Sequence, residues 1–331
     1  MRHCNDKPTY NKRTMKLFIL GNGFDISHKI ACKYSDFYAY LDKNRTDILE
    51  TMETFYSVES DSDLWSDFET SLEKDIIYDS ITDIIGENSP NLASDDFRDG
   101  DWYDAQIYVE QECEELLKNI RTGFEEWINS LEIKEVKRSY KLDKSDYYIT
   151  FNYTEILEHT YRIPSSNILH IHNKVGEELI FGHGKKSDDF NVRQALYGDE
   201  NAFLTIDEDG NVESGEVGHE KFAENAVSSF YDMMRKPTEI VIENNSEYFN
   251  ELKSIDEIVV LGHSYNQIDF PYFKKISEIK CNSLKWTLYY YSENDKQSAK
   301  EIMQELNINE SLLTYKHCTE LQIEDTQLKL F

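Results

Sequence analysis

The sequence has few cysteines, and none of them form a close pair. Five are scattered along 331 residues, and no C-x-x-C motif occurs: Cys4, Cys32, Cys113, Cys281 and Cys318. A disulfide framework needs an even, regularly spaced set of cysteines, and a zinc knuckle needs close pairs. The spacing therefore favours reduced thiols, as in a cytoplasmic protein.

Basic residues and long apolar runs are also scarce. Lys and Arg number 35 against 64 Asp and Glu, which gives a formal net charge of −29. Phosphate backbones and anionic membranes are bound by clustered Lys and Arg, so we expect no broad contact with nucleic acid or membrane.

No stretch of the sequence approaches the roughly 20 apolar residues of a membrane span. Residues 1–14 are polar and lack the apolar middle of a secretory signal. We expect them to form a tail, with 15–331 as a single domain.

Short apolar runs alternate with amphipathic segments along the rest of the chain. The apolar runs predict strands at 17–20, 147–151, 168–172, 179–182, 258–261 and 286–291. Apolar residues three or four apart predict helices at 36–56, 64–85, 105–131, 154–160, 220–235, 269–279 and 296–306. This alternation predicts an α/β, Rossmann-like fold with a mostly parallel sheet. The helical stretch at about 36–135 is predicted to be an insert. The acidic segment 185–217 is predicted to be a mobile cover or contact loop.

The first predicted strand leads directly into a glycine turn. Leu17 to Leu20 is a continuous apolar run, Gly21-Asn22-Gly23 follows it, and the first turn of a helix comes next. Strand, glycine turn and helix start form an arrangement that binds anions through backbone N–H groups. A third glycine at the dinucleotide-fold spacing is missing, because Ile26 stands there. These residues alone fit a structural β–α turn equally well.

Polar residues concentrate where other predicted strands end. They are Asn152, His170, His172, His183 and Gly262-His263-Ser264. Because parallel strands end at one edge of a sheet, these groups could converge on one site.

Three interpretations of these residues follow. A histidine could act as general base while Asn152 orients a water or a sugar hydroxyl. His170 and His172, on one strand face, could bind a metal with His183 or an Asp. The histidines could also merely hydrogen-bond within the core. A Ser-His-Asp hydrolase is not supported, since no G-x-S-x-G motif occurs.

Several segments, in order, resemble the AbiH family of bacterial phage abortive-infection proteins. They are LFILGNGFDISHKIACKYSDFYAYL, WSDFE at 65–69, TFNYTEILE at 150–158, ILHIHN at 168–173, LIFGHG at 179–184 and LGHSYNQIDFPYF at 261–273. The resemblance runs from about Met15 to Asn294. It implies a role in defence against phage.

The same segments look like a divergent sirtuin-type NAD fold. By position, Gly21, Asn22 and Gly23 match the phosphate turn of that fold, Asn152 its catalytic asparagine, His172 its catalytic histidine, and Gly262 with Ser264 its ribose loop. The nucleotide-binding residues that the resemblance implies are Gly21, Asn22, Gly23, Phe24, Asp25, Gly262, His263 and Ser264, with backbone N–H groups of Gly23–Asp25 on the pyrophosphate. Asn173 stands where such proteins have a glycine, and zinc-binding cysteine pairs are absent.

The resemblance implies an abortive-infection effector that hydrolyses NAD to nicotinamide and ADP-ribose, a glycosidase reaction. NAD or a related nucleotide is the expected ligand and no metal is expected. A phage-derived trigger protein is an expected partner, and a homo-oligomer is compatible with the sequence. Two alternatives stay open: a non-catalytic nucleotide-binding sensor or interaction module, and a metal-dependent hydrolase or nuclease built on His170 and His172.

Overall fold

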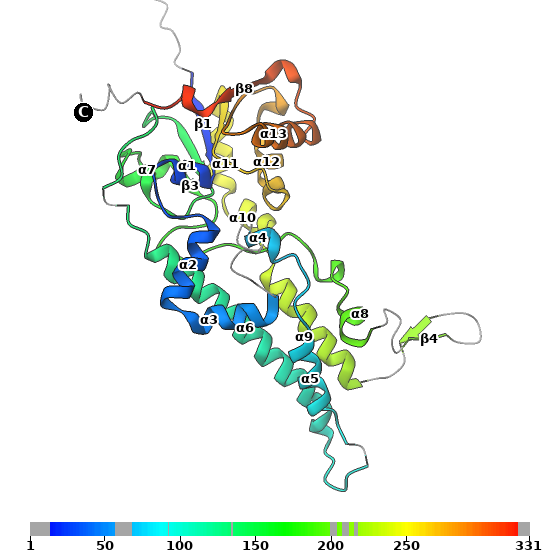
Figure 1. Cartoon of the computed structure of the whole chain (residues 1–331). Coiled ribbons are helices and arrows are strands. Elements are labelled where there is room, and N and C mark those ends of the chain that lie inside the picture. The colour runs from blue at the N-terminus through cyan, green and yellow to red at the C-terminus, as the bar shows by residue number, and fades with distance from the viewer. Residues whose placement is uncertain are drawn as a thin grey trace, which may run out of the picture. The chain divides into compact units, whose positions relative to one another are not determined.

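The fold is described here from a computed structural model of the chain (Figure 1). The residues that it describes are 14–56, 68–91, 93–133, 135–198, 204–206, 212–214 and 218–323. The predicted tail 1–14 lies outside them except for Thr14. Of the predicted cover, the described parts are 185–198 and the strands β4 (Leu204–Ile206) and β5 (Val212–Ser214), which pair antiparallel. The rest of that segment lies outside the described residues.

Within the described residues, six parallel strands form the main sheet. They are β1 (Lys16–Leu20), β2 (Tyr147–Thr150), β3 (Ile168–His170), β6 (Glu257–Leu261), β7 (Lys285–Tyr290) and β8 (Leu313–His317). They lie in the order β3-β2-β1-β6-β7-β8. All five neighbouring pairs are parallel. The winding reverses between β1 and β6, as in doubly wound sheets, so the predicted α/β, Rossmann-like fold is confirmed.

The central strands are apolar because both of their faces are covered. Leu17, Ile19, Ile149, Ile258 and Val260 are all fully buried. Parallel sheets that carry helices on both faces require such continuous apolar runs, whereas a half-exposed strand alternates apolar and polar residues. The polar residues that follow these strands are therefore held at the sheet edge by a rigid support.

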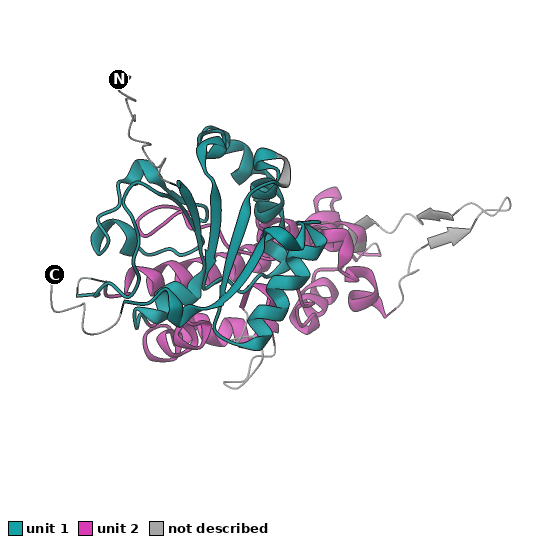
Figure 2. Cartoon of the chain, turned by 90° about the horizontal axis from the view of Figure 1, so that it is seen from above, with its two compact units in different colours: residues 1–30, 133–172, 238–331 teal, residues 31–132, 173–237 magenta. Residues whose placement is uncertain are grey.

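The chain forms two compact units, shown in teal and magenta in Figure 2. Unit 1 comprises residues 1–30, 133–172 and 238–331, and unit 2 comprises 31–132 and 173–237. Unit 1 holds the sheet, with α1 (Asn22–Ser27), α7 (Ile156–His159), α10 (Thr238–Asn244), α11 (Ser246–Glu251), α12 (Phe270–Ser277) and α13 (Glu293–Glu305). The 3-10 turn η6 (Gln267–Asp269) immediately precedes α12.

Unit 2 is mainly helical. Its helices are α2 (Tyr34–Asn44), α3 (Thr46–Tyr56), α4 (Phe68–Ser71), α5 (Asp79–Glu87), α6 (Asp104–Asn129), α8 (Val192–Tyr197) and α9 (Gly218–Met234). The long α6 confirms the helix predicted at 105–131, and it packs beside α9 (Figure 1). Val109, Leu116, Ile120 and Trp127 of α6 are buried at helical spacing.

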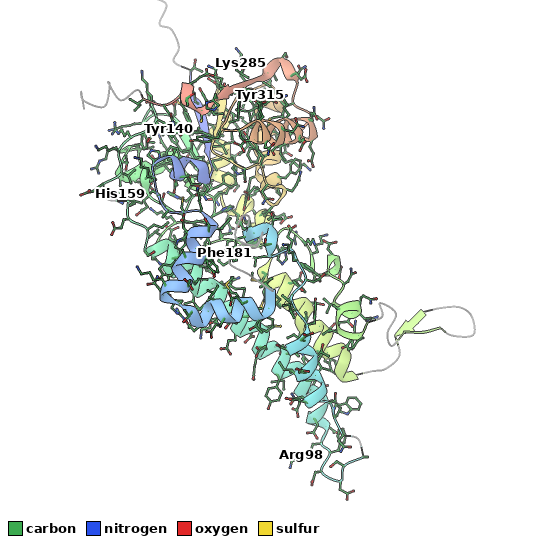
Figure 3. All side chains as sticks on the ribbon, in the orientation of Figure 1. Arg98, Tyr140, His159, Phe181, Lys285 and Tyr315 are labelled. Atoms are coloured by element: carbon green, nitrogen blue, oxygen red, sulfur yellow. The ribbon has the colours of Figure 1, made fainter. Side chains whose placement is uncertain are left out.

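Several predicted elements differ from the structure. The helix predicted at 36–56 is two helices, because Arg45 has φ −144° and ψ 59° between them. The helix predicted at 64–85 is interrupted between α4 and α5. The strand predicted at 179–182 is wrong. Its Phe181, labelled in Figure 3, packs against Phe68 and Phe124, with ring centroids 6.4 and 4.6 Å away. That apolar run buries side chains without pairing its backbone into a sheet.

Two further observations bear on the predictions from composition. No helix in the described ranges is long and apolar enough to cross a membrane. Cys32, Cys113 and Cys318 are buried thiols. These three side chains form no disulfide with one another.

Candidate functional site

Two glycine turns contact each other where the winding of the sheet reverses. Gly21 follows β1, Gly262 follows β6, and the two strands are neighbours. Gly21 N donates to Leu261 O at 3.1 Å, and Gly23 N donates to Gly262 O at 2.8 Å. A Cβ on Gly21 would lie 2.5 Å from His263 Cα, and one on Gly262, whose φ is +69°, would lie 2.4 Å from Phe24 N. Only glycine allows the two backbones to approach so closely.

This packing engages two of the N–H groups that were predicted to receive a pyrophosphate. Gly23 N donates to Gly262 O, and Phe24 N donates to Gly21 O at 2.9 Å. The spacing of the glycines is therefore explained by contact between the two turns. Binding of a nucleotide by this turn stays a prediction, and it would require these two bonds to rearrange.

The other residues predicted to bind a nucleotide have different surroundings. The side chains of Asn22 and Ser264 are exposed, while Phe24 is buried. The Phe24 ring stacks on Tyr140, with ring centroids 5.6 Å apart, and also contacts His28. Phe24 therefore has a packing role in the core of unit 1, whereas the two exposed side chains are accessible to solvent.

Asn152 follows β2 and is held in one orientation by two acceptors. Its Nδ2 donates to Asp25 Oδ1 at 2.7 Å and to Gly21 O at 3.1 Å. Because both partners are acceptors, they fix which end of the amide carries the nitrogen. The amide oxygen Oδ1 is buried and makes no hydrogen bond to the described part of the protein. A buried polar atom of this kind requires a physical explanation.

Asp25 supports Asn152 from the turn after β1. Its carboxyl group is buried and also accepts a bond from Thr154 Oγ1 at 2.6 Å. Burial raises the pKa of Asp25 to about 7, although the bonds from Thr154 and Asn152 lower it. Near neutral pH this carboxyl group therefore exchanges between its protonated and ionised forms. The predicted site residues Asp25 and Asn152 are thus in direct contact.

His172 lies just beyond β3, the strand next to β2. Its ring is buried and contacts Phe151 edge-on, with centroids 5.2 Å apart. Its Nε2 makes no bond of hydrogen-bond geometry within the described residues, and its nearest charged neighbour is Asp269 Oδ1 at 3.5 Å. The other oxygen of Asp269 lies 3.5 Å from Nε2 of the predicted site residue His263. Asp269 therefore lies between two buried histidines.

His170 has a separate set of partners. Its Nε2 lies 3.0 Å from Glu158 Oε1, and its Nδ1 lies 3.3 Å from the backbone oxygen of Asn152. His170 therefore supports the end of β2, whereas His172 faces Asp269. Among the residues that the structure describes, no three His, Cys, Asp or Glu side chains are grouped to hold a metal ion.

His183 belongs to unit 2 and is fully buried. Its ring contacts Phe190 and Tyr231, with centroids 5.2 and 6.3 Å away. Burial lowers the pKa of His183 to about 4, so the ring is neutral at physiological pH. These contacts are those of a packing residue within the helical unit.

Asn173, which stands where the expected sirtuin-type resemblance predicts a glycine, adopts the backbone conformation that glycine favours. Its φ is +61°, and its Nδ2 donates to the backbone oxygen of Glu178 at 2.6 Å. Among residues with a side chain, Asn tolerates this left-handed conformation well. Asn173 therefore supplies the backbone conformation that a glycine at this position would allow.

Three polar partners were not identified from the sequence. They are Thr154 on Asp25, Glu158 on His170, and Asp269 beside His172 and His263. All three lie in the two segments TFNYTEILE and LGHSYNQIDFPYF, where the site residues Asn152 and His263 also lie. The sequence offered one signal for these partners: each is a carboxylate or hydroxyl residue that lies close in sequence to a candidate site residue.

The arrangement brings an oriented amide and a buried histidine to the ends of adjacent strands. An amide oxygen can accept a hydrogen bond from a hydroxyl or a water, and a neutral histidine can take a proton. This combination suits proton transfer from a hydroxyl or a water and needs no nucleophilic side chain.

Comparison with known proteins gives one family. The family model described as bacteriophage abortive infection AbiH matches residues 17–290, which include most of β1, all of the candidate site and all of β7. No curated protein matches the chain.

Proposed function

The chain belongs to the AbiH family of bacteriophage abortive infection proteins, and from this premise we propose that it acts by hydrolysing NAD to nicotinamide and ADP-ribose. The proposal is supported above all by the buried Asn152 Oδ1, which has no hydrogen-bond partner in the described part of the chain, while Asp25 and Gly21 hold the other end of the amide. Leaving such an atom unbonded costs free energy. We assign it to a hydroxyl or water of the reacting complex.

The reaction breaks the bond between ribose C1′ and the nicotinamide nitrogen. The electron pair of that bond goes to the nicotinamide ring, which loses its positive charge. A water oxygen bonds to C1′, and His172 takes the proton that this water gives up. Nicotinamide is a fair leaving group, so positioning matters more than a strong nucleophile. Asn152 holds the ribose hydroxyl or the attacking water.

A second candidate is a non-catalytic nucleotide-binding sensor. It is favoured by the burial of the candidate pair, since Asn152 is 5% and His172 is 3% exposed. A substrate can reach them only if the surrounding side chains move. A sensor would bind the nucleotide at this edge of the sheet without cleaving it.

Turnover of NAD by purified variants tests both candidates. Wild type, Asn152→Ala and His172→Ala are incubated with NAD, with and without phage lysate, and nicotinamide release is followed by chromatography. We expect either substitution to lower turnover by about 10²–10⁴-fold, the usual contribution of a general base. Activity that survives both substitutions would contradict the assignment. NAD binding without cleavage under every condition would favour the sensor.

Two matched controls separate chemistry from folding. Asn167→Ala removes an asparagine of the same unit that bonds to Lys144 O at 3.0 Å and lies before β3, at the opposite edge of the sheet. His170→Ala removes the neighbouring histidine. Both controls should retain turnover. The melting temperatures of the control and test variants are compared, so that a loss of turnover is not mistaken for a loss of folding.

A further inference from the structure

The contacts around Asp269 define which nitrogen of His172 is basic. His263 Nδ1 accepts a hydrogen bond from Tyr265 N at 2.9 Å, so that nitrogen carries no proton. The proton of neutral His263 is therefore on Nε2, which lies 3.5 Å from Asp269 Oδ2. One oxygen of the carboxylate is thus directed at His263, and the other, Oδ1, lies 3.5 Å from His172 Nε2.

The distances from the Nε2 atoms of His172 and His263 to the Asp269 carboxylate are longer than those of well-formed hydrogen bonds. A separation of 3.5 Å lies at the limit for an N–H donor and an oxygen acceptor. Hydrogen bonds of catalytic groups are often long before the ligand is bound and shorten in the complex. Asp269, His172 and His263 are all buried, so water competes little for the carboxylate.

The surrounding rings limit how His172 can turn. Phe151 contacts the rings of both His172 and His263 edge-on, with centroids 5.2 and 4.4 Å away. Tyr272, from the same helix that Asp269 precedes, contacts the His172 ring at 5.7 Å. The ring is therefore held with Nε2 toward Asp269, which leaves Nδ1 pointing away from that carboxylate.

We propose that Asp269, supported by His263, is a positioning residue that keeps the proton of His172 on Nε2 and leaves Nδ1 as the atom that accepts the substrate proton. The catalytic consequence rests on the proposed function, whereas the tautomer is a property of the protein alone. A carboxylate of this kind orients the imidazole and stabilises the imidazolium that forms, without itself taking up the proton.

The tautomer is measured first, on the wild-type protein without any ligand. Nitrogen-15 NMR of histidine-labelled full-length chain at pH 8 distinguishes a protonated Nε2 from a protonated Nδ1, and the His172 signals are assigned by their loss in His172→Gln. We expect protonated Nε2 in wild type. A protonated Nδ1 would overturn the proposal whether or not NAD is cleaved, and this result does not depend on any Asp269 variant folding.

The effect of Asp269 on the tautomer and on turnover follows. In Asp269→Asn we expect the His172 proton to redistribute to Nδ1 and kcat for NAD to fall by roughly 10²–10⁴-fold, with little change in KM. Glu158→Gln, which alters the part-buried contact between Glu158 and His170, is the matched control and should change neither. An unchanged tautomer in Asp269→Asn would refute the proposal. The expected tautomers combined with no NAD cleavage by wild type would refute only the proposed function.

Discussion

Two buried carboxyl groups, one in each unit, have opposite kinds of partner. In unit 2, Glu69 meets the ammonium group of Lys236 at 2.8 Å, and the Lys236 side chain is fully buried. In unit 1, the donors that Asp25 meets at hydrogen-bond distance among the described residues are neutral, Asn152 Nδ2 and Thr154 Oγ1. Glu69 therefore faces a full positive charge, whereas the pKa of Asp25 is raised to about 7 by burial.

This difference separates a carboxylate with a structural role, Glu69, from one whose charge can change with pH, Asp25. Glu69 joins α4 to the segment that follows α9, and both belong to the helical unit. Asp25 joins the turn after β1 to the end of β2 and can change charge within the physiological pH range. Groups whose pKa lies near neutral pH are concentrated at functional sites. The raised pKa of Asp25 therefore supports a functional site at this edge of the sheet.

The largest effect is expected from removing the lysine of the structural pair. Lys236→Met leaves Glu69 buried without its ammonium partner, which should lower the free energy of unfolding by about 3–5 kcal/mol. Chemical denaturation of the full chain measures it. The double variant Lys236→Met with Glu69→Leu should recover most of the loss, because no charge is then left buried. A double variant as unstable as the single one would show that packing, not charge, is responsible.

Asp25→Asn should produce a smaller effect that depends on pH. The folded pKa of Asp25, about 7, lies above its ordinary value of 3.8, so between these values the folded chain binds a proton that the unfolded chain releases. Wild-type stability should therefore fall as pH rises through this window, by roughly 1.4 kcal/mol per pH unit from this group, and level off above pH 7.

The asparagine variant cannot ionise and should lack this component of the pH dependence. Denaturation curves at half-unit intervals from pH 4 to 8, compared between wild type and Asp25→Asn, isolate the contribution. Asp188→Asn, at an exposed carboxylate, is the control and should follow wild type. Parallel curves for wild type and Asp25→Asn would mean that the Asp25 carboxyl group is ionised throughout this pH range.

The smallest effect is expected at Thr154. Thr154→Val keeps the shape of the side chain but removes the bond to Asp25 Oδ2, which should cost about 1.5 kcal/mol at pH 8, where the acceptor is charged, and less at pH 5. Because this bond lowers the pKa of Asp25, carbon-13 NMR should show that pKa rising further in the variant. Thr160→Val removes a bond to the backbone oxygen of Val136, and its cost should not change with pH.

The sheet was predictable because its determinants are local. The apolar runs at β1, β2 and β6 and the polar groups that follow them identified the doubly wound arrangement and placed Asn152 and His172 at one edge. The strand predicted at 179–182 failed for the same reason. An apolar run shows that side chains will be buried, but it does not show whether the backbone finds a partner strand.

The partners inside the site depend on tertiary contacts and were less predictable. Asp25 and Asn152 are 127 positions apart, and the glycine turn bonds to the loop after β6. Sequence spacing suggested that Gly23 would bind phosphate, but the same spacing is required for close contact with Gly262. The role of Asp269 between two histidines arises only when β3 and β6 lie in the same sheet.

The pairing of β1 with β6 also has a consequence for the timing of synthesis. Met15 N and the Asp256 carboxylate, which meet at the beginning of these strands, are 241 positions apart. At about 5–20 residues per second, a ribosome needs roughly 12–48 s to make the chain between them. Asp269 is made later still, so a growing chain carries Asn152 and His172 for some time before their surroundings are complete. The candidate site is therefore complete only after Asp269 has been made and β6 has paired with β1.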